Sequence, residues 1–155
     1  MQKSILKIIL VLILLGVNIS VHAELPFNSI YVFTEERDKD DEECDVDPSR
    51  LVDTVKSTLR YNRLNINHNS GVDADITLYI SSNTMAVTSN HCVFNLRVEF
   101  YKYGIIDFPK RRILGEHTAC VRSEIGSYKK YNMQRMMNES VRELTEICLS
   151  KIEGK

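Results

Sequence analysis

Residues 90–104 (NHCVFNLRVEFYKYG) alternate regularly between apolar and polar side chains. Successive side chains of a β-strand point to opposite faces, so this spacing predicts a strand with two different faces. One face carries Cys92, Phe94, Leu96, Val98 and Phe100, and the other carries His91, Asn95, Arg97, Glu99, Tyr101 and Tyr103. A chain that contains this strand must cover the first face, whereas the second is suited to contact with water.

Further extended segments lie on both sides of this strand. In the first of them, Ile30 and Val32 alternate with Tyr31 and Phe33, which predicts a short strand. The others are RLNIN at 63–67, ADITLYISS at 74–82 and RILGEHTACVRSE at 112–124, with a hairpin connection expected at 81–90 and a turn at 104–112. The last segment has apolar residues on both parities, which indicates either a β-bulge or a wrongly assigned register.

Two segments show the spacing of an amphipathic helix, with apolar residues three and four positions apart. The first begins at Asp47 and Pro48, because aspartate caps free backbone N–H groups and proline fits the first turn. Its apolar stripe is Leu51, Val52, Val55 and Leu59, and the stripe of the second helix, Tyr131–Ile152, is Met133, Met137, Val141, Leu144 and Cys148. Before the first helix, residues 35–47 include nine acids among thirteen residues, so we expect a solvated acidic loop.

The order of these elements predicts a single α+β domain over residues 24–155. Amphipathic helices that follow strands must bury their apolar stripes against the apolar face of the sheet. We therefore expect a two-layer sandwich, in which a mostly antiparallel sheet of four to five strands has two helices packed on one face.

The segment LVDTVKSTLRYNRLNIN (51–67), the stretch VDADITLYI (72–80), the long amphipathic strand, the returning strand and the closing helix follow one another in a recognisable layout. This layout resembles small bacterial envelope domains such as the TolB amino-terminal domain and the outer-membrane activators of penicillin-binding proteins. Those proteins bind partners and carry no catalytic residues to transfer, so the resemblance implies a binding role. The acidic loop and the four cysteines match no part of the pattern.

The first 23 residues have the pattern of a cleaved signal peptide. Lys3 and Lys7 precede an apolar run over residues 8–17, and Val21-His22-Ala23 fits the site after which a signal peptidase cuts. A membrane-spanning helix needs about 20 apolar residues, and polar residues interrupt this run from Asn18 onward. We therefore expect export to the periplasm, with the exterior as the alternative, and no stable membrane anchor after cleavage.

The charge of the chain argues against general binding to nucleic acid. The sequence has 20 basic and 21 acidic residues, and cleavage would remove two lysines, leaving a formal charge of −3. Nucleic-acid recognition requires a concentrated basic field. The densest basic cluster, PKRR at 109–112, is small, and we interpret it as a polar connection between strands.

The four cysteines, in an exported chain, predict two disulfides. If strands 91–103 and 112–122 pair about a turn centred near residue 106, Cys92 lies opposite Cys120, which makes that pair our first choice. Cys44 and Cys148 would then pair by elimination. In parallel helices, however, those two positions would lie about 25 Å apart at 1.5 Å per residue. Three alternatives therefore stay open: the acidic loop reaches down to Cys148, the topology differs, or Cys148 is unpaired.

A zinc site made by His91, Cys92, His117 and Cys120 is an alternative, since two histidines and two cysteines are a legitimate ligand set. Neighbouring residues such as His91 and Cys92 point to opposite faces of a strand, which opposes convergence on one ion. The sequence also has no Cys-x-x-Cys, G-x-S-x-G or phosphate-binding loop. We therefore predict no metal, no cofactor and no enzymatic activity.

Aromatic residues on the polar side of the sheet indicate either a binding surface or the ordinary preference of aromatic residues for exposed strands. Tyrosine offers a large contact area with a polar tip and is enriched at interfaces. The candidate residues are Tyr31, Phe33, Tyr79, Arg97, Tyr101 and Tyr103, with Glu99 beside Arg97. The sequence thus predicts a non-enzymatic module that binds a protein partner in the envelope or outside the cell. The alternatives are a secreted enzyme or inhibitor with an unrecognised site, such as the acidic loop offered to a basic partner, and a metal carrier.

Overall fold

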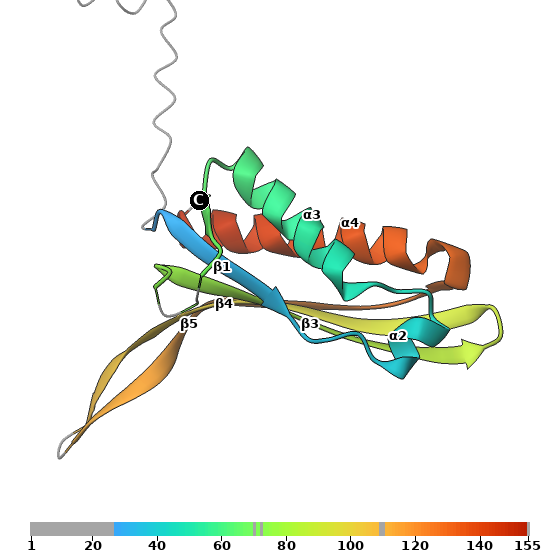
Figure 1. Cartoon of the computed structure of the whole chain (residues 1–155), viewed down its shortest axis with the longest axis horizontal. Helices are drawn as coiled ribbons and strands as arrows, with labels where there is room; N and C mark the ends of the chain where they lie inside the picture. The colour runs from blue at the N-terminus through green and yellow to red at the C-terminus, as the bar shows by residue number, and fades with distance from the viewer. Residues whose placement is uncertain (1–26, 70, 72, 109–110, 155) are drawn as a thin grey trace, which may run out of the picture.

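The computed structural model describes residues 27–69, 71, 73–108 and 111–154. The predicted signal peptide, residues 1–23, lies outside this part of the chain. The described residues form five strands and three helices (Figure 1). In chain order these are β1 (Ser29–Thr34), α2 (Lys39–Glu43), α3 (Pro48–Tyr61), β2 (Asn65–Asn67), β3 (Ile76–Thr88), β4 (His91–Phe108), β5 (Arg111–Lys129) and α4 (Lys130–Ile152).

The predicted two-layer α+β architecture is confirmed, although the sheet is mixed. Its strand order is β2-β1-β3-β4-β5. Strands β3, β4 and β5 form the expected antiparallel meander. Strand β1 runs parallel to both of its neighbours, β2 and β3, because the helix α3 carries the chain back between β1 and β2.

The apolar stripes of α3 and α4 lie where their spacing predicts. The Asp47 side chain accepts a hydrogen bond from the Ser49 N–H at 2.9 Å, and Pro48 occupies the first turn of α3. Both helices cover one face of the sheet (Figure 1). The residues buried between the layers include Leu51, Val55 and Leu59 of α3, Met133, Met137, Val141 and Leu144 of α4, and Phe94, Leu96, Val98 and Phe100 of β4.

The strands are longer than the sequence suggests. Strand β3 continues to Thr88, so residues 81–88 are not the predicted connection, and their polar character conceals a strand in which Ser82 and Thr84 are buried. Strand β4 continues to Phe108, where the pattern predicted a turn. The predicted bulge in the returning strand is confirmed, since Phe100 pairs with Cys120 and Tyr101 pairs with Thr118, which leaves Ala119 without a partner in the register.

All four cysteines form disulfides, but the predicted pairing is wrong. The bonds join Cys44 to Cys92 and Cys120 to Cys148, with Cα atoms 5.9 and 5.6 Å apart. The predicted pairing about residue 106 is wrong because the last pair of β4 and β5 is Phe108 with Arg111. In this register Cys92 lies opposite Tyr128. Each bond now fastens the helical side of the molecule to the sheet.

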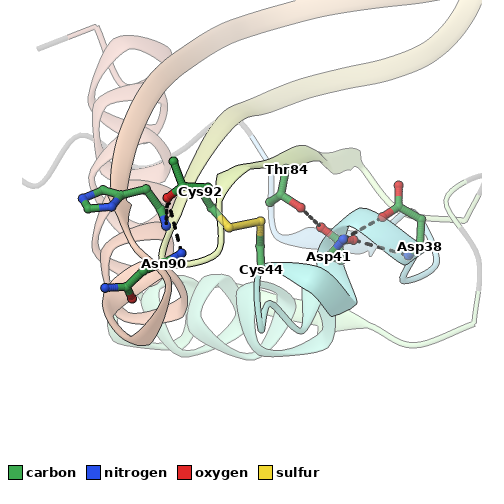
Figure 2. Close-up of a disulfide and its surroundings, with 8 residues drawn as sticks. Asp38, Asp41, Cys44, Thr84, Asn90 and Cys92 are labelled. Carbon is green, nitrogen blue, oxygen red and sulfur yellow. Dashed lines mark hydrogen bonds between the residues drawn. A yellow bond between two sulfur atoms is a disulfide. The ribbon is translucent and has the colours of Figure 1, made fainter.

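The acidic segment 35–47 is not a simple solvated loop. Residues 39–43 form α2, and Asp41, Cys44 and Val46 are buried. The Thr84 hydroxyl donates a hydrogen bond of 2.9 Å to Asp41, which also reaches back to cap the start of α2 (Figure 2). Burial, which outweighs these hydrogen bonds, raises the pKa of Asp41. The Cys44–Cys92 disulfide holds this short helix against the sheet.

Strands β4 and β5 extend beyond the rest of the sheet as a two-stranded ribbon, which we call the arm. The last pair between β3 and β4 is Thr77 with Tyr101. Residues 102–108 therefore pair with β5 alone, and their partners are residues 111–117. The arm projects away from the two long helices (Figure 1).

Candidate binding surface

The face of the sheet opposite the helices, which we call the outer face, is formed by alternate residues of four neighbouring strands. The strand registers set Tyr31, Thr77 and Tyr101 side by side in one row, and Phe33, Tyr79, Glu99 and Val121 in the next. Helices α3 and α4 lie on the other side of the sheet (Figure 1). Helix α2 packs on that side as well, because it is joined to Cys92 and Thr84 of the buried face. On the outer face, strand side chains therefore meet the solvent without a covering layer of helices.

Three of the predicted aromatic residues form a stacked row on the outer face. The ring of Phe33 stacks on Tyr31, with centroids 5.9 Å apart, and on Tyr79, with centroids 4.8 Å apart. All three side chains are half-buried. The Tyr79 hydroxyl donates a hydrogen bond to Glu35, and burial followed by this bond raises the pKa of Tyr79. The row is thus a packed apolar strip whose edge is open to solvent.

Arg97 and Glu99 form a charged pair on the outer face, beside the aromatic row. The Arg97 guanidinium donates a 2.6 Å hydrogen bond to Glu99, and the Thr118 hydroxyl donates to the same carboxylate at 3.0 Å. Because Glu99 neutralises the charge of Arg97, this pair can hydrogen-bond to a partner and orient it, but it does not create a strong electrostatic field.

The other two predicted aromatic residues belong to a separate pair. Tyr101 and Tyr103 meet edge to face, with ring centroids 5.4 Å apart. Tyr101 is only 5% exposed, and burial raises its pKa well above the usual range of tyrosine. Tyr103 is more exposed and lies at the base of the arm. The predicted patch is therefore divided, and Tyr101 supports its neighbours rather than offering contact surface.

A loop covers the end of the outer face next to Tyr31. A Cβ atom at Gly71 would lie 2.9 Å from Thr77 Oγ1 and 3.2 Å from Tyr31 Cδ1, so this backbone passes directly over both side chains. Asp75 fixes the loop to β1, since its carboxylate accepts from the N–H groups of Asn28 and Ser29 at 2.9 and 3.0 Å. These backbone hydrogen bonds lower the pKa of Asp75.

The sequence prediction missed a second apolar group at the opposite end of the outer face. Met85 and Val93 are cross-strand partners, and Ile125 lies on the neighbouring strand β5 opposite Asn95. Met85 and Ile125 are both exposed. The alternation of β3 beyond Ser81 is the signal that would have revealed Met85, but the polar residues around it hid the strand.

The residues proposed for a zinc site do not form one. Cys92 and Cys120 belong to different disulfides, so neither supplies the thiolate that zinc binds. No group of three histidine, cysteine, aspartate or glutamate side chains within the described ranges is placed to hold a metal ion.

A polar hollow of about 540 Å³ lies between the starts of α3 and α4, and one hydrogen bond, from Asp47 to Gln134, joins the two helices there. The Gln134 carbonyl accepts from the Asp47 N–H at 2.6 Å, and its amide donates to Asn138 at 3.0 Å. Arg135, which also lines the hollow, pairs with Glu139 at 2.9 Å. We interpret the hollow as a structural junction between the two helices.

Comparison with known proteins does not place the chain in a family. No family model matches the sequence, and no curated protein matches it. Among solved structures, the chain is similar to a minor lipoprotein from Acinetobacter baumannii, with 14% identity and a TM-score of 0.44, over 84% of this chain and 94% of that one. It is also similar to a hypothetical protein from Chlamydia trachomatis, with 10% identity and a TM-score of 0.44, over 83% and 96%. Similarity at this level assigns neither family nor function, so the resemblance to the TolB domain and to the penicillin-binding-protein activators stays a prediction.

Proposed function

We propose that this chain is an exported envelope protein, without enzymatic activity, that binds a protein partner through the outer face of its sheet. The two buried disulfides support export, since such bonds form and persist in oxidising compartments. Across the residues that the structure describes, no helix is both long and apolar enough to span a membrane. The segment that would direct export, residues 1–23, supports the same assignment through its sequence.

The observation that carries the binding role is the half-buried aromatic row on a face without helices. A sheet face in contact with water is usually polar along its whole length. Here Tyr31, Phe33 and Tyr79 form a stacked apolar strip beside the Arg97–Glu99 pair. Aromatic side chains with a charged pair at their edge match the composition of a protein interface, in which a desolvated aromatic centre has a polar rim.

Site-specific photocrosslinking tests this role. A photoreactive phenylalanine analogue would replace Tyr79 on the outer face or, as the matched control, Tyr61 on α3, which is 87% exposed on the helical side. Crosslinking is then performed in the compartment where the protein resides. We expect one recurrent protein adduct from the position of Tyr79 and none from that of Tyr61.

A second variant separates the surface from the stability of the fold. Arg97→Glu replaces the exposed member of the charged pair with a like charge next to Glu99, and the buried core is untouched. We expect this variant to remain folded and to lose the adduct, because like charges across an interface are strongly unfavourable. Equal crosslinking from the two tyrosine positions, or an adduct that persists in folded Arg97→Glu, would refute the proposal.

A further inference from the structure

The arm exposes apolar side chains that the fold does not cover. Ile105 and Leu114 are cross-strand partners on the arm, and they are 57% and 73% exposed. A two-stranded ribbon without a third strand or a packed helix is marginally stable in water. The apolar pair therefore lies where it adds little to folding and is available to an external surface.

Apolar side chains lie on both faces of the arm. Leu114 and its neighbour Ile113 point to opposite sides of β5, because side chains alternate along a strand. A flat protein surface or an added helix would cover only one of these sides. A surrounding apolar medium, such as the boundary between lipid headgroups and acyl chains, accommodates both.

The charge of the arm favours a negatively charged surface. The paired residues of the arm, 102–108 and 111–117, contain three basic and two acidic residues, a formal charge of +1, whereas the whole sequence has a formal charge of −1. Lys102 and Arg112 are exposed on the two strands of the arm. Long basic side chains extend their charged ends to anionic headgroups while their stems stay in apolar surroundings.

We propose that the arm inserts reversibly into the interface of a membrane that contains anionic lipid. The apolar residues supply the buried area and the basic residues supply the attraction to the headgroups, as in other interfacial elements. This contact is separate from the partner-binding outer face and does not depend on it.

Tryptophan fluorescence tests the insertion directly, because the chain contains no tryptophan. Ile105→Trp places a probe on the arm, and Ile125→Trp places a matched probe on the same sheet, at a residue that is 79% exposed. Each purified protein is mixed with vesicles of phosphatidylethanolamine and phosphatidylglycerol, or with vesicles of phosphatidylcholine alone. We expect Ile105→Trp to shift its emission to shorter wavelength with the anionic vesicles, and Ile125→Trp to show no shift.

Vesicle sedimentation measures the contribution of the apolar pair. The double variant Ile105→Ser/Leu114→Ser should bind anionic vesicles at least about tenfold more weakly than the wild-type chain. High salt should weaken wild-type binding as well, because it screens the basic side chains from the headgroups. Circular dichroism of the double variant should match the wild type, since both residues lie outside the core.

Three results would overturn the proposal. The first is the absence of wild-type binding to the anionic vesicles, and the second is undiminished binding by the folded double variant. The third is a short-wavelength emission of Ile105→Trp that appears without vesicles and grows with protein concentration, because the arm would then be seated on a second copy of the chain. None of these results bears on the photocrosslink from the position of Tyr79, so the two proposals fail independently.

Discussion

The body of the sheet and the arm are built from the same two strands, yet they differ in what covers them. In the body, the apolar residues of β4 are buried under α3 and α4, and both disulfides lie in the layer between. In the arm, the pairing of β4 with β5 continues without a helical layer (Figure 1), apolar residues lie on both faces, and Leu114 is exposed. Strand pairing therefore does not by itself bury apolar residues, and a second layer determines whether they stabilise the fold.

Removal of the Cys44–Cys92 disulfide should have the largest effect, and it should fall on the body. The bond joins residues 48 positions apart, and the loss of loop-closure entropy gives about 4 kcal/mol for a loop of that length. We expect the double variant Cys44→Ser/Cys92→Ser to lose about that much free energy of unfolding in urea. Replacing both cysteines avoids an unpaired thiol in either state. A loss below about 1 kcal/mol would mean that α2 and the sheet hold together without the bond.

A matched pair of leucine variants tests the difference between body and arm directly. Leu96 is fully buried on β4 under the helices, so Leu96→Ala should cost about 3 kcal/mol through lost burial and the cavity that remains. Leu114→Ala removes the same atoms from the arm and should change the free energy of unfolding by less than about 0.5 kcal/mol. Chemical denaturation of the two variants gives both values. Similar losses would show that the arm is part of the folding core.

Two glycines, one in each region, provide the next contrast. A Cβ atom at Gly126 would lie 2.5 Å from the buried ring of Phe94, which also stacks on Tyr128. Gly126→Ala must displace that ring, and we expect a loss of about 2 kcal/mol. A Cβ atom at Gly104 in the arm would lie 3.0 Å from the exposed side chain of His117, which is free to rotate away. Gly104→Ala should therefore be nearly neutral, and equal losses in thermal unfolding would contradict the comparison.

The two layers could be predicted from the sequence because the spacing of apolar residues shows which side of each helix or strand is buried. The apolar stripes of the two long helices and the inner side of β4 are each visible without knowledge of their partners. The length of β3 was hidden because Ser82 and Thr84 face the helical layer as polar residues, and Thr84 is accommodated by a hydrogen bond to Asp41 from a distant segment. Such a long-range pair leaves no periodic signal in either segment.

The cysteine pairing was wrong, and the aromatic patch is divided in the structure, for related reasons. The turn was predicted near residue 106, whereas the last pair of β4 and β5 is Phe108 with Arg111, so the predicted register set Cys92 opposite the wrong residue. The aromatic residues of the outer face were identified correctly by parity, but parity does not report which neighbour covers a side chain. Tyr101 thus lies on the predicted face but is buried beside Tyr103, which parity could not reveal.

The effect of pH gives the smallest and most specific contrast, within the body itself. The folded pKa of Asp41 lies above 3.8, mainly because the carboxyl is buried, so the folded state binds its proton more tightly than the unfolded state. The contribution of Asp41 to the free energy of unfolding is therefore greatest in acid, and it is lost as pH rises from about 3.8 through the folded pKa. Asp41→Asn still accepts from Thr84 but does not titrate, so its free energy of unfolding should rise relative to wild type over that range.

Asp75→Asn is the control of opposite sign. Hydrogen bonds from the Asn28 and Ser29 N–H groups lower the pKa of Asp75, so this variant should lose stability relative to wild type as pH rises toward 3.8. Urea unfolding of the three proteins between acid and neutral pH measures both trends, and a curve for Asp41→Asn parallel to that of the wild type would show that the pKa of Asp41 is not raised in the folded state.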